Sequence, residues 1–158
     1  KMNNFILILG EEIFQFLKPY EIFLIPIFVG GVTQMVKFIF YSLRHGWDFH
    51  YIMTHGHMPS FHTSFVVSMA TSIGYYSGIT SGAFTVAVII ALIVIDDAVR
   101  LRVFIGDQGR YLNRLMQQLN LEEKFPRLKE RVGHRVSEVI VGGIFGFLLT
   151  MTMIKLLN

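Results

Sequence analysis

The sequence predicts an all-α protein: an integral membrane helical bundle of about four transmembrane helices, with an N-terminal interfacial helix and a cytoplasmic amphipathic helix. Hydrophobic residues make up 53% of the 158-residue chain and charged residues only 16%, and the mean hydropathy is +0.52. Soluble domains are less apolar than this. Several apolar stretches also approach the roughly 20 residues that a helix needs to cross a bilayer. We therefore expect residues 1–158 to form a single membrane-embedded domain.

The first apolar segment, residues 3–17, is predicted to lie at the membrane interface. It carries Glu11 and Glu12 near its middle. If this segment crossed the bilayer, two adjacent carboxylates would be buried in hydrocarbon, which costs several kcal/mol. A helix that lies along the membrane surface keeps both carboxylates in water.

Four later stretches are long enough, or nearly so, to span the membrane. They cover residues 22–41, 61–78, 79–95 and 136–157. The glycine pair at residues 30–31 and the pattern Gly142-x-x-x-Gly146 are typical of membrane helices that approach each other closely. Ser60 suits the N-cap of the second span.

The connections between the spans differ in polarity. Residues 77–82 form a short turn without charge. In the long connection over residues 102–133, apolar residues recur at helical spacing between arginines and glutamines: Tyr111, Leu112, Leu115, Met116 and Leu119. We expect an amphipathic surface helix here, which either covers the bundle or binds anionic headgroups through its arginines. After Pro126, residues 127–132 are predicted to form a short charged helix.

Threading the four spans alternately through the bilayer puts the polar clusters at their ends on one side. These clusters are Lys37 with Arg44, His62, Asp96 with Asp97, and His134 with Glu138. The connections on this side hold ten Lys and Arg residues from Arg44 to Arg135, whereas the opposite turn holds none. Cation-rich loops face the cytoplasm. We therefore expect an integral membrane protein whose site faces the cytoplasm.

Imidazoles, carboxylates and cations gathered at one membrane surface favour phosphate chemistry on a lipid. A neutral histidine can attack phosphorus, and a carboxylate bonded to its other ring nitrogen stabilises the imidazolium that follows. His134 and Glu138 share a helix face by their spacing. Because histidine titrates near neutrality in general, His62 suits a proton donor. Each residue also has a simpler interpretation: Lys37 can reach the headgroups as an isolated cation, and Asp97 can pair with a nearby arginine.

Other kinds of site are less well supported. Four histidines in one connection raise a metal hypothesis, but their spacing is loose and no carboxylate pattern accompanies them: His45, His50, His55 and His57. The chain has no cysteine, which excludes disulfides and thiolate metal sites. The cation bias of one membrane side explains the basic residues better than nucleic-acid binding does. We therefore expect no metal, no other cofactor and no nucleic acid.

Three separated motifs carry a resemblance to a known family. They are residues 57–64, Gly106-Asp107-Gln108 with Asn113-Arg114-Leu115, and residues 128–138 with Gly142-Gly143. Together they resemble the divergent branch of the type-2 phosphatidic acid phosphatases, which is related to vanadium-dependent haloperoxidases. The resemblance covers nearly the whole chain from about Gly30 onward.

The resemblance implies roles for individual residues. Lys37 and Arg44 keep the spacing of the cations that hold phosphoryl oxygens in the broader superfamily. Ser60 would bond a phosphate oxygen, and His62 would protonate the leaving alcohol. His134 would be the nucleophile that forms a phosphohistidine.

Glu138, four residues after His134, matches the acid of the same motif, and Asp97 is a further catalytic candidate. The substrate implied is a membrane lipid phosphate or pyrophosphate, of the phosphatidate, phosphatidylglycerol phosphate or isoprenyl phosphate class. No cofactor is implied, and a homo-oligomer stays open.

The chain also departs from the family pattern. Phe61 stands where a serine is usual, and His57 where a glycine is usual. Leu128 occupies the position of an expected arginine, for which Arg102 is the preferred substitute as a phosphate ligand. These departures motivate an alternative: a membrane protein that binds or transports lipid phosphates without turnover. A haloperoxidase is a distant third hypothesis, because a membrane-embedded site is a poor setting for peroxide and halide chemistry.

Overall fold

The computed structural model describes residues 12, 15–46, 58–121, 124–130 and 136–158. Within these residues the regular structure is helical, with no strand. In chain order the elements are η1 (Lys18–Tyr20), α2 (Glu21–His45), α3 (Phe61–Ser77), α4 (Gly82–Asp96), the π-helical turn η3 (Asp97–Leu101), α5 (Arg102–Gln118) and α6 (Val136–Leu157). The predicted all-α class is confirmed. The predicted interfacial helix, residues 3–17, lies largely outside the described residues.

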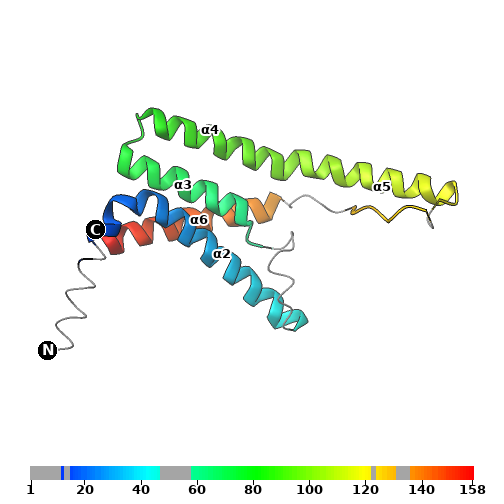
Figure 1. Cartoon of the computed structure of the whole chain (residues 1–158), viewed down its shortest axis with the longest axis horizontal. Coiled ribbons are helices and arrows are strands. Elements are labelled where there is room, and N and C mark those ends of the chain that lie inside the picture. Colours follow the sequence, from blue (N-terminus) through cyan, green and yellow to red (C-terminus); the bar gives the residue numbers. More distant parts are fainter. Residues whose placement is uncertain (1–11, 13–14, 47–57, 122–123, 131–135) are drawn as a thin grey trace.

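Helix α3 lies at the centre of the bundle. It packs against α2, α4 and α6, and α2 also contacts α6 (Figure 1). The turn between α3 and α4 is sharp because Gly78 adopts a φ of 87° and the Ser81 side chain caps α4 by accepting a hydrogen bond from the Phe84 N–H. Tyr76 at the end of α3 donates a 2.7 Å hydrogen bond to Glu21 at the start of α2. Helix α2 therefore runs antiparallel to α3, and the sharp turn makes α4 antiparallel to α3 as well.

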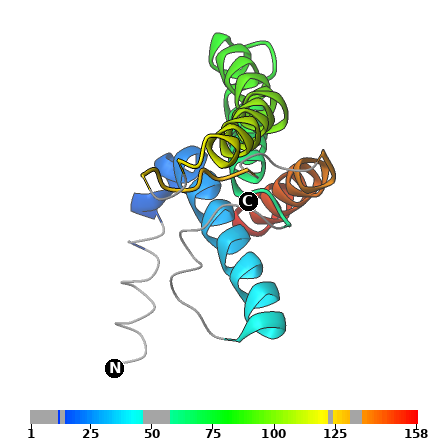
Figure 2. The ribbon, with the colours of Figure 1, turned by 90° about the vertical axis from the view of Figure 1, so that its right-hand side faces the viewer.

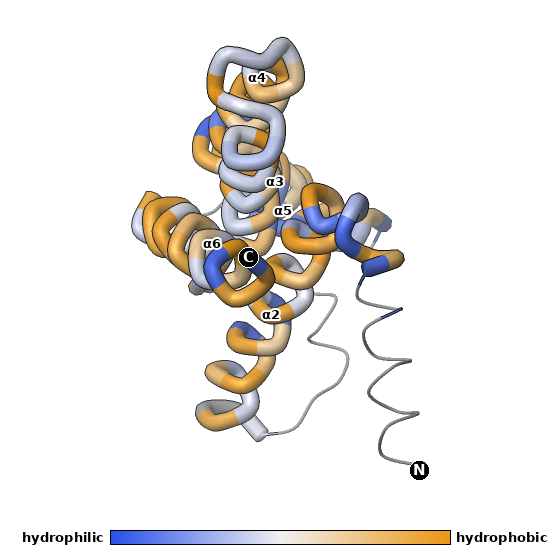
Figure 3. The backbone as a smooth tube through the Cα atoms, turned by 90° about the vertical axis from the view of Figure 1, so that its left-hand side faces the viewer, coloured by the Kyte–Doolittle hydropathy of each residue, from blue (hydrophilic) through white to orange (hydrophobic). Residues whose placement is uncertain are grey.

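Within the described part of the chain, three helices are long and apolar enough to cross a membrane: Gln15–Leu43, Gly82–Gln118 and Val136–Leu157. Large apolar side chains point outward along them, such as Phe23, Ile39, Leu92, Ile93 and Leu148. Figure 3 shows hydrophobic residues all along α2 and α6. The interior, by contrast, holds many small and polar residues. This arrangement suits a hydrocarbon solvent, which does not penalise exposed apolar surface.

A serine ladder joins α3 to its neighbours. Ser60, Ser64, Ser68 and Ser72 recur every four residues and are fully buried. Ser64 donates to the Gly142 carbonyl oxygen (2.7 Å), Ser68 accepts from Thr150 (2.6 Å) and Ser72 donates to the Ile22 carbonyl oxygen (3.1 Å). Within the bilayer such hydrogen bonds satisfy groups that lipid cannot. The serine ladder therefore fixes how α3 sits between α2 and α6.

Glycines make this close packing possible. A Cβ atom on Gly142 would lie 2.6 Å from the Ser60 carbonyl oxygen, and one on Gly146 would clash with the backbone of Ser64. A Cβ on Gly30 would lie 3.0 Å from the Phe61 ring. The predicted close contacts are confirmed at Gly30 and at Gly142-x-x-x-Gly146, but not at Gly31, where a Cβ atom would have no neighbour within 4 Å.

The region after α4 differs from its prediction. An amphipathic helix does form, but α5 continues α4 through η3 as one long helix and extends away from the bundle instead of covering it (Figure 1). Figure 2 looks nearly along this helix, and α4 and α5 overlap in that view. The prediction of a short helix over residues 127–132 is wrong for residues 127–130, which form no helix; residues 131–132 lie outside the described part.

Candidate phosphate site at the helix ends

The N-termini of α3 and α6 meet at Ser60. The Ser60 N–H donates a 3.1 Å hydrogen bond to the carbonyl oxygen of Glu138. The Ser60 hydroxyl oxygen accepts hydrogen bonds from the Thr63 N–H (3.5 Å) and the Thr63 hydroxyl (3.0 Å). The predicted N-cap is therefore confirmed. No acceptor for the Ser60 hydroxyl proton is found among the described residues.

Lys37 of α2 and Glu138 of α6 bring opposite charges to the same end of the bundle. Only 6% of Lys37 and 7% of Glu138 is exposed, and the two charges attract each other. Burying either charge alone is costly, whereas a buried pair compensates much of that cost. Three helices thus contribute to one buried polar cluster, which we call the helix-end cluster: Lys37, Ser60 and Glu138.

His62 lies in the first turn of α3, two residues after Ser60, and is half-buried. Phe61 packs edge-to-face against its ring, with the ring centroids 5.5 Å apart. Phe61 also lies against Gly30 of α2. The aromatic residue that replaces the usual serine therefore fills the α2–α3 interface.

Two predicted site residues cannot be placed by their side chains. His134 lies outside the described residues, and of Arg44 only the backbone, at the end of α2, is described. The predicted contact between His134 and Glu138 stays a prediction. The described part of α6 begins at Val136, so Glu138 is in its first turn.

Asp97 and Arg102 are paired with each other. The Arg102 Nε atom lies 2.9 Å from the Asp97 Oδ2 atom, and both side chains are partly exposed. Asp97 begins η3, which contacts α6, and Arg102 begins α5. The simpler interpretation of Asp97, pairing with a nearby arginine, therefore matches the structure. The neighbouring Asp96–Arg100 ion pair (3.3 Å) is more exposed.

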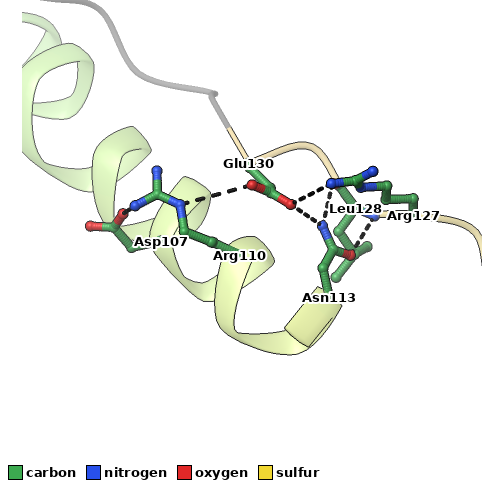
Figure 4. Close-up of polar contacts among 6 residues, drawn as sticks. All are labelled: Asp107, Arg110, Asn113, Arg127, Leu128 and Glu130. Atoms are coloured by element: carbon green, nitrogen blue, oxygen red, sulfur yellow. Dashed lines mark hydrogen bonds and ion pairs between the residues drawn. The ribbon is translucent and has the colours of Figure 1, made fainter. Parts of the chain in front are cut away.

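A second polar arrangement, absent from the sequence predictions, lies on α5. Asn113, which is 9% exposed, donates hydrogen bonds to the Leu128 carbonyl oxygen (2.9 Å) and to Glu130 (3.0 Å), and its amide oxygen accepts from the Leu128 N–H (2.9 Å) (Figure 4). A Cβ atom on Gly109 would lie 2.7 Å from the Lys129 carbonyl oxygen. We call this arrangement the clasp: Gly109, Asn113 and Leu128–Glu130.

Arginines surround the acidic residue of the clasp. Arg127 lies 3.3 Å and Arg110 3.9 Å from the Glu130 carboxylate, and Arg110 also pairs with Asp107 at 3.3 Å (Figure 4). The hydrogen bond from Asn113, followed by that from Arg127, lowers the pKa of Glu130. The side chain at position 128 makes none of these hydrogen bonds, because Asn113 binds the backbone there.

Comparison with known proteins decides the family. The family model described as "Divergent PAP2 family" matches residues 19–149. The chain belongs to the divergent PAP2 family. It is also similar to the "Uncharacterized membrane protein YuiD" of Bacillus subtilis (strain 168), with 32% identity over 140 residues that cover 80% of this chain and 87% of the relative. No solved structure matches.

Family membership confirms the resemblance seen in the motifs, and it agrees with a membrane protein built from apolar helices. The matched region of the divergent PAP2 family contains both the helix-end cluster and the clasp. Two of the three motifs meet at the clasp, because the Asn113 segment binds the Leu128–Glu130 segment. The second and third motifs are thus far apart in sequence but in contact in the structure, where α5 meets the segment that leads to α6.

Proposed function

We propose that this divergent PAP2 protein is a membrane phosphatase that hydrolyses a lipid phosphate or pyrophosphate through a phosphohistidine intermediate. The observation that carries the proposal is the helix-end cluster, where Lys37, Ser60 and Glu138 converge from three helices. A buried cation and a hydroxyl are groups that bind phosphate. Their position at the ends of membrane helices suits a substrate held in the bilayer.

In the proposed reaction, Lys37, Arg44 and Ser60 hold the phosphoryl oxygens. His134 attacks phosphorus and forms a P–N bond as the P–O bond to the lipid alcohol breaks, and His62 gives its proton to the leaving oxygen. Water then attacks the phosphohistidine; His62 takes a proton from the water, and phosphate leaves as the P–N bond breaks.

The remaining predicted residues have supporting roles in the proposal. Glu138 orients His134 and stabilises its positive charge. Arg102 approaches the developing negative charge of the phosphoryl group, and Asp97 orients Arg102 through their ion pair.

The proposed topology has four spans: α3 crosses the membrane in addition to the helices that contain α2, α4 and α6. Helix α3 has 17 residues, the lower end of the range for a membrane helix, and its central position places it within the bilayer if α2, α4 and α6 cross it. The proposed site then faces the cytoplasm, because the cation-rich connections lie on that side.

Phosphate release from purified protein in detergent tests the activity. The substrates are phosphatidate, phosphatidylglycerol phosphate and an isoprenyl phosphate. We expect release from at least one, inhibition by vanadate, and a loss of about a thousandfold or more in His134→Ala. His50→Ala, a histidine outside the three motifs, serves as the control and should keep its activity. If no lipid phosphate in the panel is hydrolysed, the proposal fails.

A binding or transport protein without turnover is the second candidate. The observation that favours it is Phe61, which packs against Gly30 where the family usually has a hydroxyl. If the protein is such a binding or transport protein, a lipid phosphate binds saturably and no phosphate is released. Binding then survives His134→Ala and is lost when Lys37→Ala and Arg44→Ala are combined.

A further inference from the structure

The clasp borders a basic cavity on α5. The cavity has a volume of about 660 Å³ and is lined by Arg110, Arg114 and Arg127, with Glu130 as its acidic residue. Arg114 forms no ion pair within the described part of the chain. Each of the other two arginines shares its charge with a carboxylate but keeps further N–H donors. Three guanidinium groups against two carboxylates, Asp107 and Glu130, leave a net positive charge at the cavity.

An apolar groove adjoins this cavity. Leu112, Leu115, Leu119 and Leu128 contribute to its lining. Met116 and Phe125 line both the groove and the basic cavity, so the two are neighbours. The clasp thus presents cations next to a hydrocarbon surface.

We propose that the clasp binds an anionic phospholipid, with the phosphate among the arginines and an acyl chain along the apolar groove. Charge complementarity identifies the head, because guanidinium groups pair strongly with phosphate oxygens. The adjoining groove identifies an amphiphile instead of a simple anion. The bilayer that holds the bundle supplies such lipids. This site is separate from the helix-end cluster, and its ligand needs no cleavable phosphate.

The built geometry of the clasp supports the proposal. Asn113 and Gly109, one helical turn apart, hold residues 128–130 on α5. This contact brings Arg127 next to Arg110 across Glu130. The arginines therefore come from two chain segments that the clasp holds together, which preorganises them for one ligand.

Lipid binding to the full chain in detergent, measured by native mass spectrometry, tests this inference. The probes are dioctanoyl phosphatidylglycerol, dioctanoyl phosphatidylcholine and inorganic phosphate. A phosphodiester lipid is not a phosphatase substrate of the proposed kind, so the result does not depend on activity. We expect phosphatidylglycerol to bind more tightly than phosphatidylcholine, and Arg110→Gln, Arg114→Gln and Arg127→Gln combined to weaken it about tenfold or more.

A matched control removes the same charge outside the cavity. Arg100→Gln, Lys124→Gln and Lys155→Gln combined should leave the affinity within about twofold. The single change Arg114→Gln removes an exposed arginine that has no ion pair with any described residue. It leaves the clasp contacts intact and should weaken binding even if the triple variant folds poorly. Glu130→Gln removes the negative charge from the cavity and should strengthen binding.

Three results would overturn the inference. Equal losses in the two triple variants would indicate a general charge effect. Equal affinity for the two lipids would remove the role of the anionic head. Inorganic phosphate that binds as tightly as phosphatidylglycerol, with no effect of Leu115→Gln on the lipid, would indicate a site for free anions.

Discussion

Lys37 and Glu138 illustrate how single residues join stability to function in this bundle. Both are buried in helices that pack together, and each compensates the charge of the other. The sequence placed both residues at span ends, so their common side of the membrane was predictable. Their mutual burial was not, because it depends on how closely α2 and α6 approach each other.

Lys37→Met tests this pair. The substitution leaves the Glu138 carboxylate buried without its cation, which should lower the free energy of unfolding by about 3–5 kcal/mol and abolish phosphate release. Adding Glu138→Leu should restore most of the thermal stability in detergent but none of the activity. A double variant as unstable as Lys37→Met would show that the two charges do not compensate each other.

Gly142 tests the close approach of α3 and α6. Alanine normally stabilises a helix relative to glycine, but here its Cβ would lie 2.6 Å from the Ser60 carbonyl oxygen. We expect Gly142→Ala to lower the free energy of unfolding by about 1–3 kcal/mol. Gly31→Ala is the matched control, since a Cβ on Gly31 has no atom within 4 Å, and its midpoint of thermal unfolding should not fall. Equal midpoints for the two variants would contradict the close packing.

The helices themselves were largely predictable, whereas their partners were not. Long apolar runs indicated α2, α4 and α6 because hydrocarbon selects such composition. The serine ladder was missed, since serine within an apolar helix shows its role only when the carbonyl or hydroxyl partner on another helix is known. The direction of α5 was missed too, because apolar periodicity indicates a buried or interfacial face without naming what covers it.

The clasp shows why the segment after Pro126 was predicted wrongly. A run of charged residues favours a helix by propensity, but Asn113 binds both the N–H and the carbonyl oxygen of Leu128. The Asn113 side chain satisfies these backbone groups, so helical hydrogen bonds are not needed there. A tertiary contact therefore overrides the local preference.

Acid should loosen the clasp. The folded state lowers the pKa of Glu130 below its ordinary value of 4.5, so the carboxylate form stabilises the clasp above that value. This contribution is lost as the pH falls below 4.5 through the lowered pKa. We expect amide hydrogen exchange of residues 124–130, corrected for the intrinsic effect of pH, to speed up over this range. Glu130→Gln keeps an oxygen that accepts from Asn113 and should make the corrected exchange independent of pH; an unchanged pH response would contradict this account.

At the scale of the whole molecule, the topology can be tested because the chain has no cysteine. Single cysteines at Thr80, in the turn between α3 and α4, and at Lys124, beside the clasp, mark opposite ends of the long helix. With intact cells, a membrane-impermeant maleimide should label Thr80→Cys and spare Lys124→Cys until the cells are opened. The reverse pattern would place the helix-end cluster on the outer side. Labelling of both would contradict the proposed crossing.

The continuous helix formed by α4, η3 and α5, from Gly82 to Gln118, is longer than a membrane crossing requires. Its 37 residues measure about 55 Å at 1.5 Å per residue, nearly twice the roughly 30 Å of the hydrocarbon layer. Either about 25 Å of this helix extends into the aqueous phase, or the helix is steeply tilted relative to the membrane normal. It can also bend at η3, where the regular α-helical hydrogen bonding is interrupted. A partner that binds the end of α5 would therefore exert force on η3, which carries Asp97 of the Asp97–Arg102 ion pair and contacts α6.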